Sequence, residues 1–241
     1  MDVQKNSYTF IYSTIIVVIV ATLLTIAAVS LQPAQEKNVE VEKKQNILAS
    51  LHIPSTPKNA EELYSRYITG TKVVNEAGEI VSGVDAFTLN MREDLKLPRN
   101  KRHLAIYEAR KGDSAFIVIP LYGKGLWGPI WGYISFLRDT SVGNGQPEFN
   151  TVYGAVFDHK GETPGLGAEI NQPWFQKPFM GKKIFNDKGQ FVSIEVVKGG
   201  GTQNEPNKVD AISGGTITSK GLQAMLDTCL SVYQNYFKQP K

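Results

Sequence analysis

The chain has 241 residues, with 26 Lys and Arg against 23 Asp and Glu and a formal net charge of +3. This balance predicts no polyanionic partner, and no basic stripe interleaved with aromatic residues indicates nucleic-acid binding. The single cysteine, Cys229, excludes an intramolecular disulfide and a cluster held by four cysteines. The three histidines show no metal-ligand spacing, so any redox chemistry must come from an organic cofactor.

The N-terminal region contains a candidate membrane span, residues 10–32, after a tail of residues 1–9. The span has no charged residue, and as a helix it would be about 35 Å long, enough to cross a hydrocarbon core of about 30 Å. A buried core helix and a signal peptide cleaved near residues 28–30 are the alternatives. The run is long for a signal peptide, so we expect a retained anchor. The lysines flanking the span leave its orientation undecided.

The region after the span changes in composition twice. Residues 33–59 are rich in Glu, Lys, Gln and Asn and predict a solvated stalk that includes a short helix. Residues 60–69 predict another short helix. Short segments rich in Val, Ile, Phe and Tyr then predict strands at 103–110, 115–122, 132–137, 151–157 and 191–197. A hairpin turn is expected at 186–189, before the last strand.

The last predicted element is a helix of residues 219–237. Apolar residues recur in it at the spacing of one buried helix face, namely Leu222, Leu226, Cys229, Tyr233 and Phe237. Cys229 is therefore expected to be a packed core thiol. The predicted fold class is α+β, with residues 60–241 forming one domain behind a single-helix anchor.

A first glycine-rich segment, residues 123–128, spells Gly-x-Gly-x-x-Gly after an apolar strand. A dinucleotide site needs a helix to begin there, with its amino terminus against the pyrophosphate. The following Pro129-Ile130-Trp131-Gly132 cannot open such a helix, so a nicotinamide cofactor is not expected. We expect a tight loop in which Trp127 and Trp131 are rim or core residues, or contact an aromatic cofactor or partner.

A second segment, residues 162–167, reads Glu-Thr-Pro-Gly-Leu-Gly. Its proline and glycines impose an unusual backbone path that can approach a ligand closely. Glu162 and Thr163 offer polar contacts, and Leu166 offers an apolar one. Taken by itself, this pattern is also that of a structural turn.

A third segment, residues 210–219, contains four hydroxyl residues and two glycines directly before the last helix. Thr218 or Ser219 would serve as an ordinary N-cap, which accounts for only one of the hydroxyls. Backbone amides at a helix amino terminus also favour a phosphate, and a hydroxyl there could carry a phosphate ester. From these residues alone, a helix cap and a phosphate site both remain open.

These motifs, in this order behind an N-terminal span, resemble the C-subunit family of the sodium-translocating NADH:quinone oxidoreductases. The resemblance covers nearly the whole chain, and residues 125–133 favour this family over its nearest competitor, the G subunit of the Rnf complex. Both families share an FMN-binding domain, so the resemblance implies an antiparallel sheet with flanking helices.

The resemblance also implies a covalent cofactor. In this family a flavin transferase joins FMN to a threonine in a pattern close to Asp-x-x-Ser-Gly-Ala-Thr. Here the pattern begins at Asp210 and places the acceptor at Thr216, with Gly215 where alanine is usual. Thr218 is a weaker alternative acceptor.

The other site residues implied by the resemblance surround the flavin. Residues of the second segment would lie near its ring or ribityl chain, with Leu166 packing on the ring. Lys198 would supply positive charge there, or else lie at a solvated strand end. The residues expected to bind the cofactor are Glu162, Thr163, Gly165, Leu166, Gly167, Lys198, Ser213, Gly214, Gly215 and Thr218.

The function implied is a one-electron relay from a metal centre elsewhere in a membrane complex to a second covalent flavin in another subunit. The chain would be a single-pass protein of the bacterial inner membrane with its C-terminal domain on the periplasmic side. Its partners would be the other subunits and, during maturation, the flavin transferase. A membrane-tethered binding module without a cofactor and a flavin reductase that binds NADH itself are the rival functions.

Overall fold

A computed structural model describes residues 6–142 and 147–239. Part of the expected N-terminal tail, residues 1–5, lies outside the described residues. The chain divides into two units, Met1–Lys43 and Lys44–Lys241.

The candidate span lies in a long helix, α1 (Asn6–Ser50). The helix is long and apolar enough to cross a membrane, and all side chains of residues 10–32 are exposed. The prediction of a separate short helix in the stalk is wrong, because α1 continues through Pro33 to Ser50. A proline inside a helix removes one backbone hydrogen bond, which the strong helix formers that follow Pro33 can offset.

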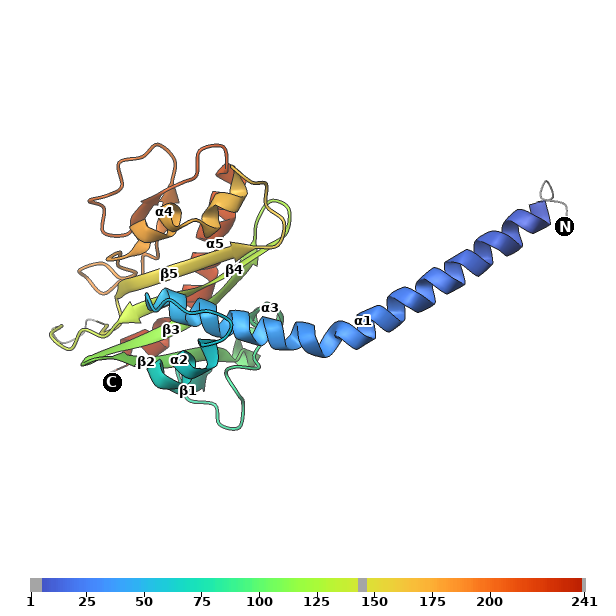
Figure 1. Ribbon diagram of the computed structural model, residues 1–241. Coiled ribbons are helices and arrows are strands. Elements are labelled where there is room, and N and C mark those ends of the chain that lie inside the picture. The colour runs from blue at the N-terminus through green and yellow to red at the C-terminus, as the bar shows by residue number, and fades with distance from the viewer. Residues whose placement is uncertain (1–5, 143–146, 240–241) are drawn as a thin grey trace. The chain divides into compact units, whose positions relative to one another are not determined.

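The second unit is built on an antiparallel sheet of strands in the order β1-β2-β3-β4-β5 (Figure 1). The strands are β1 (Ile68–Val74), β2 (Leu104–Lys111), β3 (Ser114–Lys124), β4 (Pro129–Leu137) and β5 (Thr151–His159). Strands β2 to β5 confirm four of the predicted strands. Strand β1 was not predicted, and it takes up the end of the segment expected to be helical.

The predicted strand 191–197 is mostly wrong. Only β6 (Glu195–Val197) is regular, and it pairs in parallel with β7 (Lys208–Asp210). The hairpin turn before it is confirmed, because the amide of Gly189 donates to the carbonyl of Asn186 at 2.9 Å and Phe185 bridges Phe191 in antiparallel.

Helices and short 3-10 turns complete the second unit. The helices are α2 (Ala60–Tyr67), α3 (Met91–Asp94), α4 (Pro173–Gln176), α5 (Thr216–Ser231) and α6 (Gln234–Lys238). The 3-10 turns are η1 (Arg99–Lys101), η2 (Gly167–Asn171) and η3 (Lys177–Phe179).

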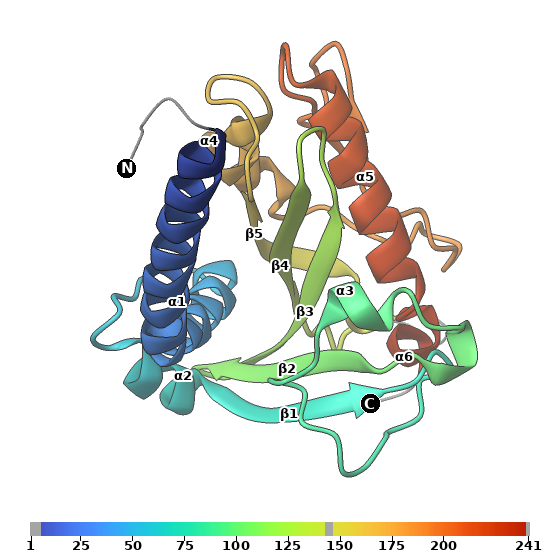
Figure 2. The same cartoon turned by 90° about the vertical axis from the view of Figure 1, so that its right-hand side faces the viewer.

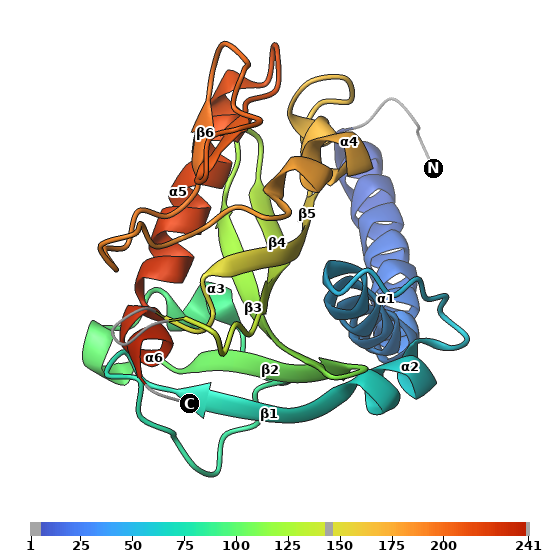
Figure 3. The same cartoon turned by 90° about the vertical axis from the view of Figure 1, so that its left-hand side faces the viewer.

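Both faces of the sheet are buried, and alternate residues of each strand point to opposite faces. Ile117 and Ile119 of β3 pack with α5 and α6, whereas Phe116 and Val118 pack with residues 47–53 and α2. Figures 2 and 3 show these two layers on opposite sides of the sheet. This double burial explains why the strands are continuously apolar in sequence.

Helix α5 packs its apolar face against β3. Cys229 is fully buried there, and its Sγ donates to the carbonyl of Tyr122 at 3.3 Å and accepts from the amide of the same residue at 3.3 Å. Burial raises the pKa of this thiol to about 12 because the thiolate would be desolvated. The prediction that Cys229 is an inert core thiol is confirmed.

Candidate functional site

Three segments that are far apart in sequence meet at one end of the sheet. They are the β3–β4 turn, the loop that follows β5, and the start of α5, and Figure 2 shows all three at the same end. Between them lies a cavity of about 390 Å³. It is lined by Leu126, Trp127, Glu162, Thr163, Leu166, Gly167, Gly214, Gly215, Thr216, Ile217 and Thr218.

The β3–β4 turn closes the first side of this cavity. The amide of Gly125 donates to the carbonyl of Gly128 at 2.8 Å, so the Gly-x-Gly-x-x-Gly segment forms a hairpin turn and opens no helix. Trp127 stands on the turn with 70% of its surface exposed. This geometry agrees with the expected tight loop, and it offers no helix amino terminus for a dinucleotide.

Glu162 connects all three segments. Its Oε1 accepts from the amide of Trp127 at 2.9 Å, and its Oε2 accepts from the hydroxyl of Thr218 at 2.5 Å. Its own amide donates to Nδ1 of His159 at 3.1 Å. The side chain is buried, and a buried carboxylate is stabilised only when its oxygens are hydrogen-bonded. Glu162 therefore holds the turn, the loop and the helix in one arrangement.

Glycines allow the segments to approach this closely. A Cβ on Gly167 would lie 2.3 Å from the hydroxyl oxygen of Thr218 and 2.4 Å from Oε2 of Glu162. A Cβ on Gly214, whose φ is +78°, would lie 2.7 Å from Cδ2 of Leu166. A side chain at either position would collide with the neighbouring segment, and at Gly214 it would also be strained.

Helix α5 begins at Thr216, three positions earlier than predicted. Its N-cap is Gly215, which has no side-chain cap, so the expected capping by Thr218 or Ser219 is wrong. The hydroxyl of Ser219 instead accepts from the amide of Ile212 at 3.1 Å. The first intrahelical bond runs from the amide of Ser219 to Gly215, which leaves the amides of residues 216–218 without a helical acceptor.

The two candidate acceptor threonines lie in different environments. Thr216 is exposed, and within the described residues its hydroxyl makes no hydrogen bond. Thr218 is only 2% exposed, and its hydroxyl is committed to Glu162. Of the two hydroxyls, only that of Thr216 is accessible to a modifying enzyme.

Most of the predicted binding residues line the cavity. Exceptions are Gly165, Lys198 and Ser213, which are exposed and lie outside its lining. Lys198 follows the end of β6, the strand-end position considered for it.

Leu126 and Ile217 are apolar lining residues that the sequence reasoning missed, and Trp127 was considered only as one of several alternatives. The signal for Leu126 and Ile217 was an apolar side chain next to glycine or threonine in a segment expected to form a tight loop or the start of a helix. Leu126 is 44% exposed and Ile217 is 57% exposed, as expected for residues at the rim of a ligand site rather than in a core.

The fold is that of an FMN-binding domain, and the family model for the FMN-binding domain matches residues 125–231. The C subunit of the Na(+)-translocating NADH-quinone reductase from Vibrio vulnificus is 32% identical over 222 residues, covering 85% of this chain and 83% of that protein. The corresponding subunit from Neisseria meningitidis serogroup B is 29% identical over 239 residues, covering 92% and 88%. The chain belongs to this C-subunit family.

Two solved structures share the fold of this chain. The C subunit from Parabacteroides distasonis is 40% identical and superposes with a TM-score of 0.76, covering 88% of this chain and 98% of that one. Shewanella oneidensis NqrC, at 24% identity and a TM-score of 0.67, shows the same fold over 85% and 97% of the two chains.

Proposed function

We propose that this chain is an electron-relay subunit of a sodium-translocating NADH:quinone reductase and carries FMN joined through its phosphate to Thr216. One observation carries the covalent part of the proposal. An exposed threonine hydroxyl stands at the first residue of α5, beside the amides of residues 216–218, which lack helical acceptors. Such amides favour phosphate oxygens through hydrogen bonding and the helix dipole.

The cavity suits the rest of the cofactor. Its volume of about 390 Å³ lies within the range of small-molecule pockets. Leu126, Trp127 and Leu166 provide apolar surface for an isoalloxazine ring, and Thr163 provides a polar group. Gly214 and Gly215 allow the backbone to approach a phosphate without a Cβ in the way.

Attachment needs an activated flavin donor. FMN itself has no good leaving group on phosphorus, whereas a flavin dinucleotide such as FAD has a pyrophosphate. The oxygen of Thr216 would form a bond to the flavin phosphorus, and the bond from that phosphorus to the bridging oxygen would break. AMP would leave, and the hydroxyl proton would pass to a base of the flavin transferase. The reaction is a transfer of a phosphoryl-linked group and changes no oxidation state.

When bound, FMN supplies the ability to accept and donate electrons one at a time. The role of this chain is to hold the cofactor and fix its surroundings. Glu162 sets the distance between the turn carrying Trp127 and the helix carrying Thr216, and the apolar rim restricts water at the ring. By its relationship to the C-subunit family, we place the chain among the other subunits of a membrane complex, between an electron-donating metal centre and a second flavin.

We further propose that residues 10–32 cross the bacterial inner membrane once and that residues 60–241 bind FMN on the periplasmic side. Residues 33–59 connect the two, and from Lys44 onward this segment is already part of the second unit, with residues 47–53 in its core. The apolar part of α1 supports the span. A phosphoester tether suits a periplasmic flavin, because a dissociated FMN could not easily be replaced there.

The test is denaturing gel electrophoresis under ultraviolet light, using chain produced with an active flavin transferase. The expected result is a fluorescent band for the wild type and a dark band for Thr216→Ala. A dark wild-type band, with the transferase active on a control substrate, would overturn the covalent attachment and favour a binding module without a covalent cofactor.

A further inference from the structure

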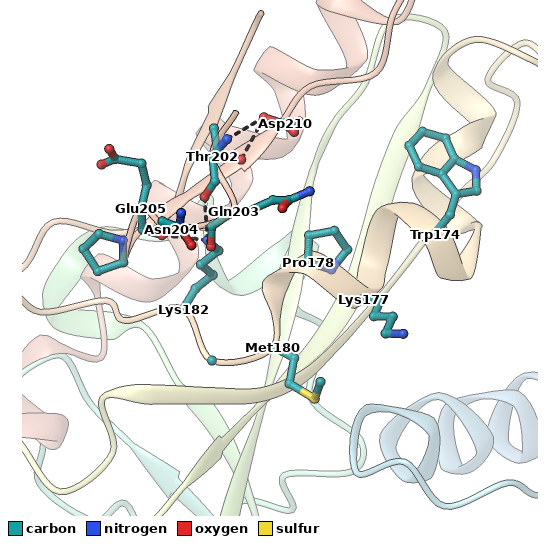
Figure 4. Close-up of a pocket in the computed structure, with 12 residues that line it drawn as sticks. Trp174, Lys177, Pro178, Met180, Lys182, Thr202, Gln203, Asn204, Glu205 and Asp210 are labelled. Carbon is teal, nitrogen blue, oxygen red and sulfur yellow. Dashed lines mark hydrogen bonds between the residues drawn. The ribbon is translucent and has the colours of Figure 1, made fainter. Parts of the chain in front are cut away.

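A second cavity lies at the other end of the acceptor motif, beside Asp210. It has a volume of about 570 Å³ and opens between residues 174–182 and the loop of residues 202–206 (Figure 4). Asp210, the first residue of the Asp-x-x-Ser-Gly-x-Thr pattern, lines this cavity, whereas Thr216 lines the candidate flavin cavity. The two ends of the motif are therefore held by different parts of the fold.

In the described part of the chain, only one carboxylate oxygen of Asp210 accepts hydrogen bonds. Its Oδ1 accepts two hydrogen bonds from Thr202, one from the amide at 3.3 Å and one from the hydroxyl at 2.8 Å. Within the described residues, its Oδ2 makes no hydrogen bond, and the residue is half-buried. The carboxylate thus has a fixed orientation with one oxygen left for an external donor.

The loop that carries Thr202 has little conformational preference of its own. Gly199, Gly200 and Gly201 precede Thr202 with φ values of +119°, +78° and +85°, a region that side chains rarely adopt. This loop joins the parallel strands β6 and β7, which end together at the pair Val197 and Asp210. Three consecutive glycines lose much backbone entropy on ordering, so other residues must hold the loop in place.

Lys182 holds the loop of residues 202–205 in place. It is only 6% exposed, and its Nζ donates to the carbonyls of Thr202 at 2.9 Å, Gln203 at 3.4 Å and Glu205 at 2.6 Å. Figure 4 shows its side chain reaching beneath the turn. The three protons of an ammonium group thus match three carbonyls of one turn. Burial lowers the pKa of Lys182, while the carboxylates of Asp210 and Glu205 act in the opposite direction.

We infer that Lys182 and Thr202 are positioning residues for the modification of Thr216. Lys182 orders the 202–205 turn, and Thr202 orients Asp210 so that its Oδ2 is presented to a hydrogen-bond donor of the flavin transferase. This inference rests on the proposed attachment of FMN to Thr216. Thr202 and Lys182 act before the cofactor is present, and neither lines the candidate flavin cavity.

The experiment measures the initial rate of flavin incorporation into full-length chain that was made without the transferase and purified in detergent. Purified transferase and FAD are then added, and the chain concentration is varied. Thr202→Val, which keeps the volume but removes the hydroxyl, is expected to lower kcat/KM for the chain about tenfold, mainly through a higher KM. Thr202→Ser should restore most of the rate. Gln203→Ala is the matched control, because Gln203 contributes only its backbone carbonyl.

A double-mutant cycle separates positioning from general stability. If Thr202 acts through Asp210, Thr202→Val should have no further effect on the rate in an Asp210→Asn background. Hydrogen exchange of residues 199–206 should rise in Thr202→Val and in Lys182→Met, while the melting temperature of Thr202→Val stays within a few degrees of wild type.

Several outcomes would overturn the inference. These are an unchanged rate for Thr202→Val, an equal tenfold loss in both Asp210 backgrounds, or a loss of rate that follows a loss of melting temperature. If the wild-type chain takes up no flavin from an active transferase, the proposed attachment to Thr216 is itself wrong. This result is distinguishable from the three outcomes above, in which the wild-type chain is modified.

Discussion

The hydroxyl of Thr218 donates a 2.5 Å hydrogen bond to Oε2 of Glu162, joining the first turn of α5 to the loop after β5. The other oxygen of the same carboxylate accepts from the amide of Trp127. Through Glu162, the turn, the loop and the helix that surround the candidate flavin cavity become one unit. This bond occupies the buried hydroxyl of Thr218, whereas Thr216 of the same motif is exposed.

Thr218→Val should reduce stability without preventing flavin attachment. The substitution leaves a buried carboxylate oxygen without its donor, and we expect the free energy of unfolding to fall by about 2 kcal/mol. Thr228→Val is the control, because Thr228 is exposed on the same helix. Denaturant unfolding of the full chain, followed by gel fluorescence, measures both properties. Loss of covalent flavin in a well-folded Thr218→Val chain would contradict the assigned roles.

The loss of stability caused by a substitution of Glu162 should depend on how many of its hydrogen bonds the new side chain keeps. Glu162→Gln can still accept from the amide of Trp127, so we expect a loss of about 1 kcal/mol, against about 3 kcal/mol for Glu162→Ala. Denaturant unfolding followed by tryptophan fluorescence measures both values. Equal stability of the alanine variant and the wild type would show that the carboxylate does not hold the segments together.

Gly167→Ala should be strongly destabilising, because its Cβ would lie within 2.4 Å of oxygens of Thr218 and Glu162. Relief of that overlap requires both buried side chains to move, at a cost of about 2–3 kcal/mol. Gly161→Ala, six positions earlier, is the matched control, because a Cβ there meets no atom within 4 Å. Thermal unfolding of both variants is the measurement, and an equal effect of the two would refute the tight packing at Gly167.

The buried thiol of Cys229 should make stability depend on alkaline pH. Its folded pKa is raised from 9.0 to about 12, so the unfolded chain loses this proton first as pH rises. The contribution of the protonated Cys229 thiol to the free energy of unfolding is therefore fully present below pH 9 and is lost between about pH 9 and 12. The difference in unfolding free energy between wild type and Cys229→Ala should shrink over that interval. Buried tyrosines that titrate in both proteins largely cancel in this difference. A difference that stays constant would contradict the raised pKa.

The strands β2 to β5 could be predicted because their apolar runs are bounded by turn residues. Strand β1 could not, because Ile68–Val74 is only partly buried and adjoins a helical segment. The strand expected at 191–197 was overestimated because its apolar residues enter the core from an irregular segment. The continuation of α1 past Pro33 was missed because a proline is a helix breaker by propensity alone, although it can be accommodated inside a helix.

The sequence motifs that form the candidate site could be predicted, but their detailed structure could not. The glycine segments and the threonine pattern identified most of the cavity lining. The start of α5 at Thr216 was not predicted, because the hydroxyl residues beyond it are good N-caps by type and yet are used inside the helix. The burial of Lys182 was also beyond prediction, since a lysine in a polar segment is ordinarily solvated and its carbonyl partners lie about twenty residues away.

The most direct measurement is mass spectrometry of the peptide that contains Thr216, taken from chain produced with an active flavin transferase. The account predicts one FMN ester per chain, with fragment ions that place it on Thr216 and leave Thr218 unmodified. The Thr216→Ala chain should yield the same peptide without flavin. An ester on Thr218, or an unmodified Thr216 peptide from a transferase that labels a control substrate, would contradict it.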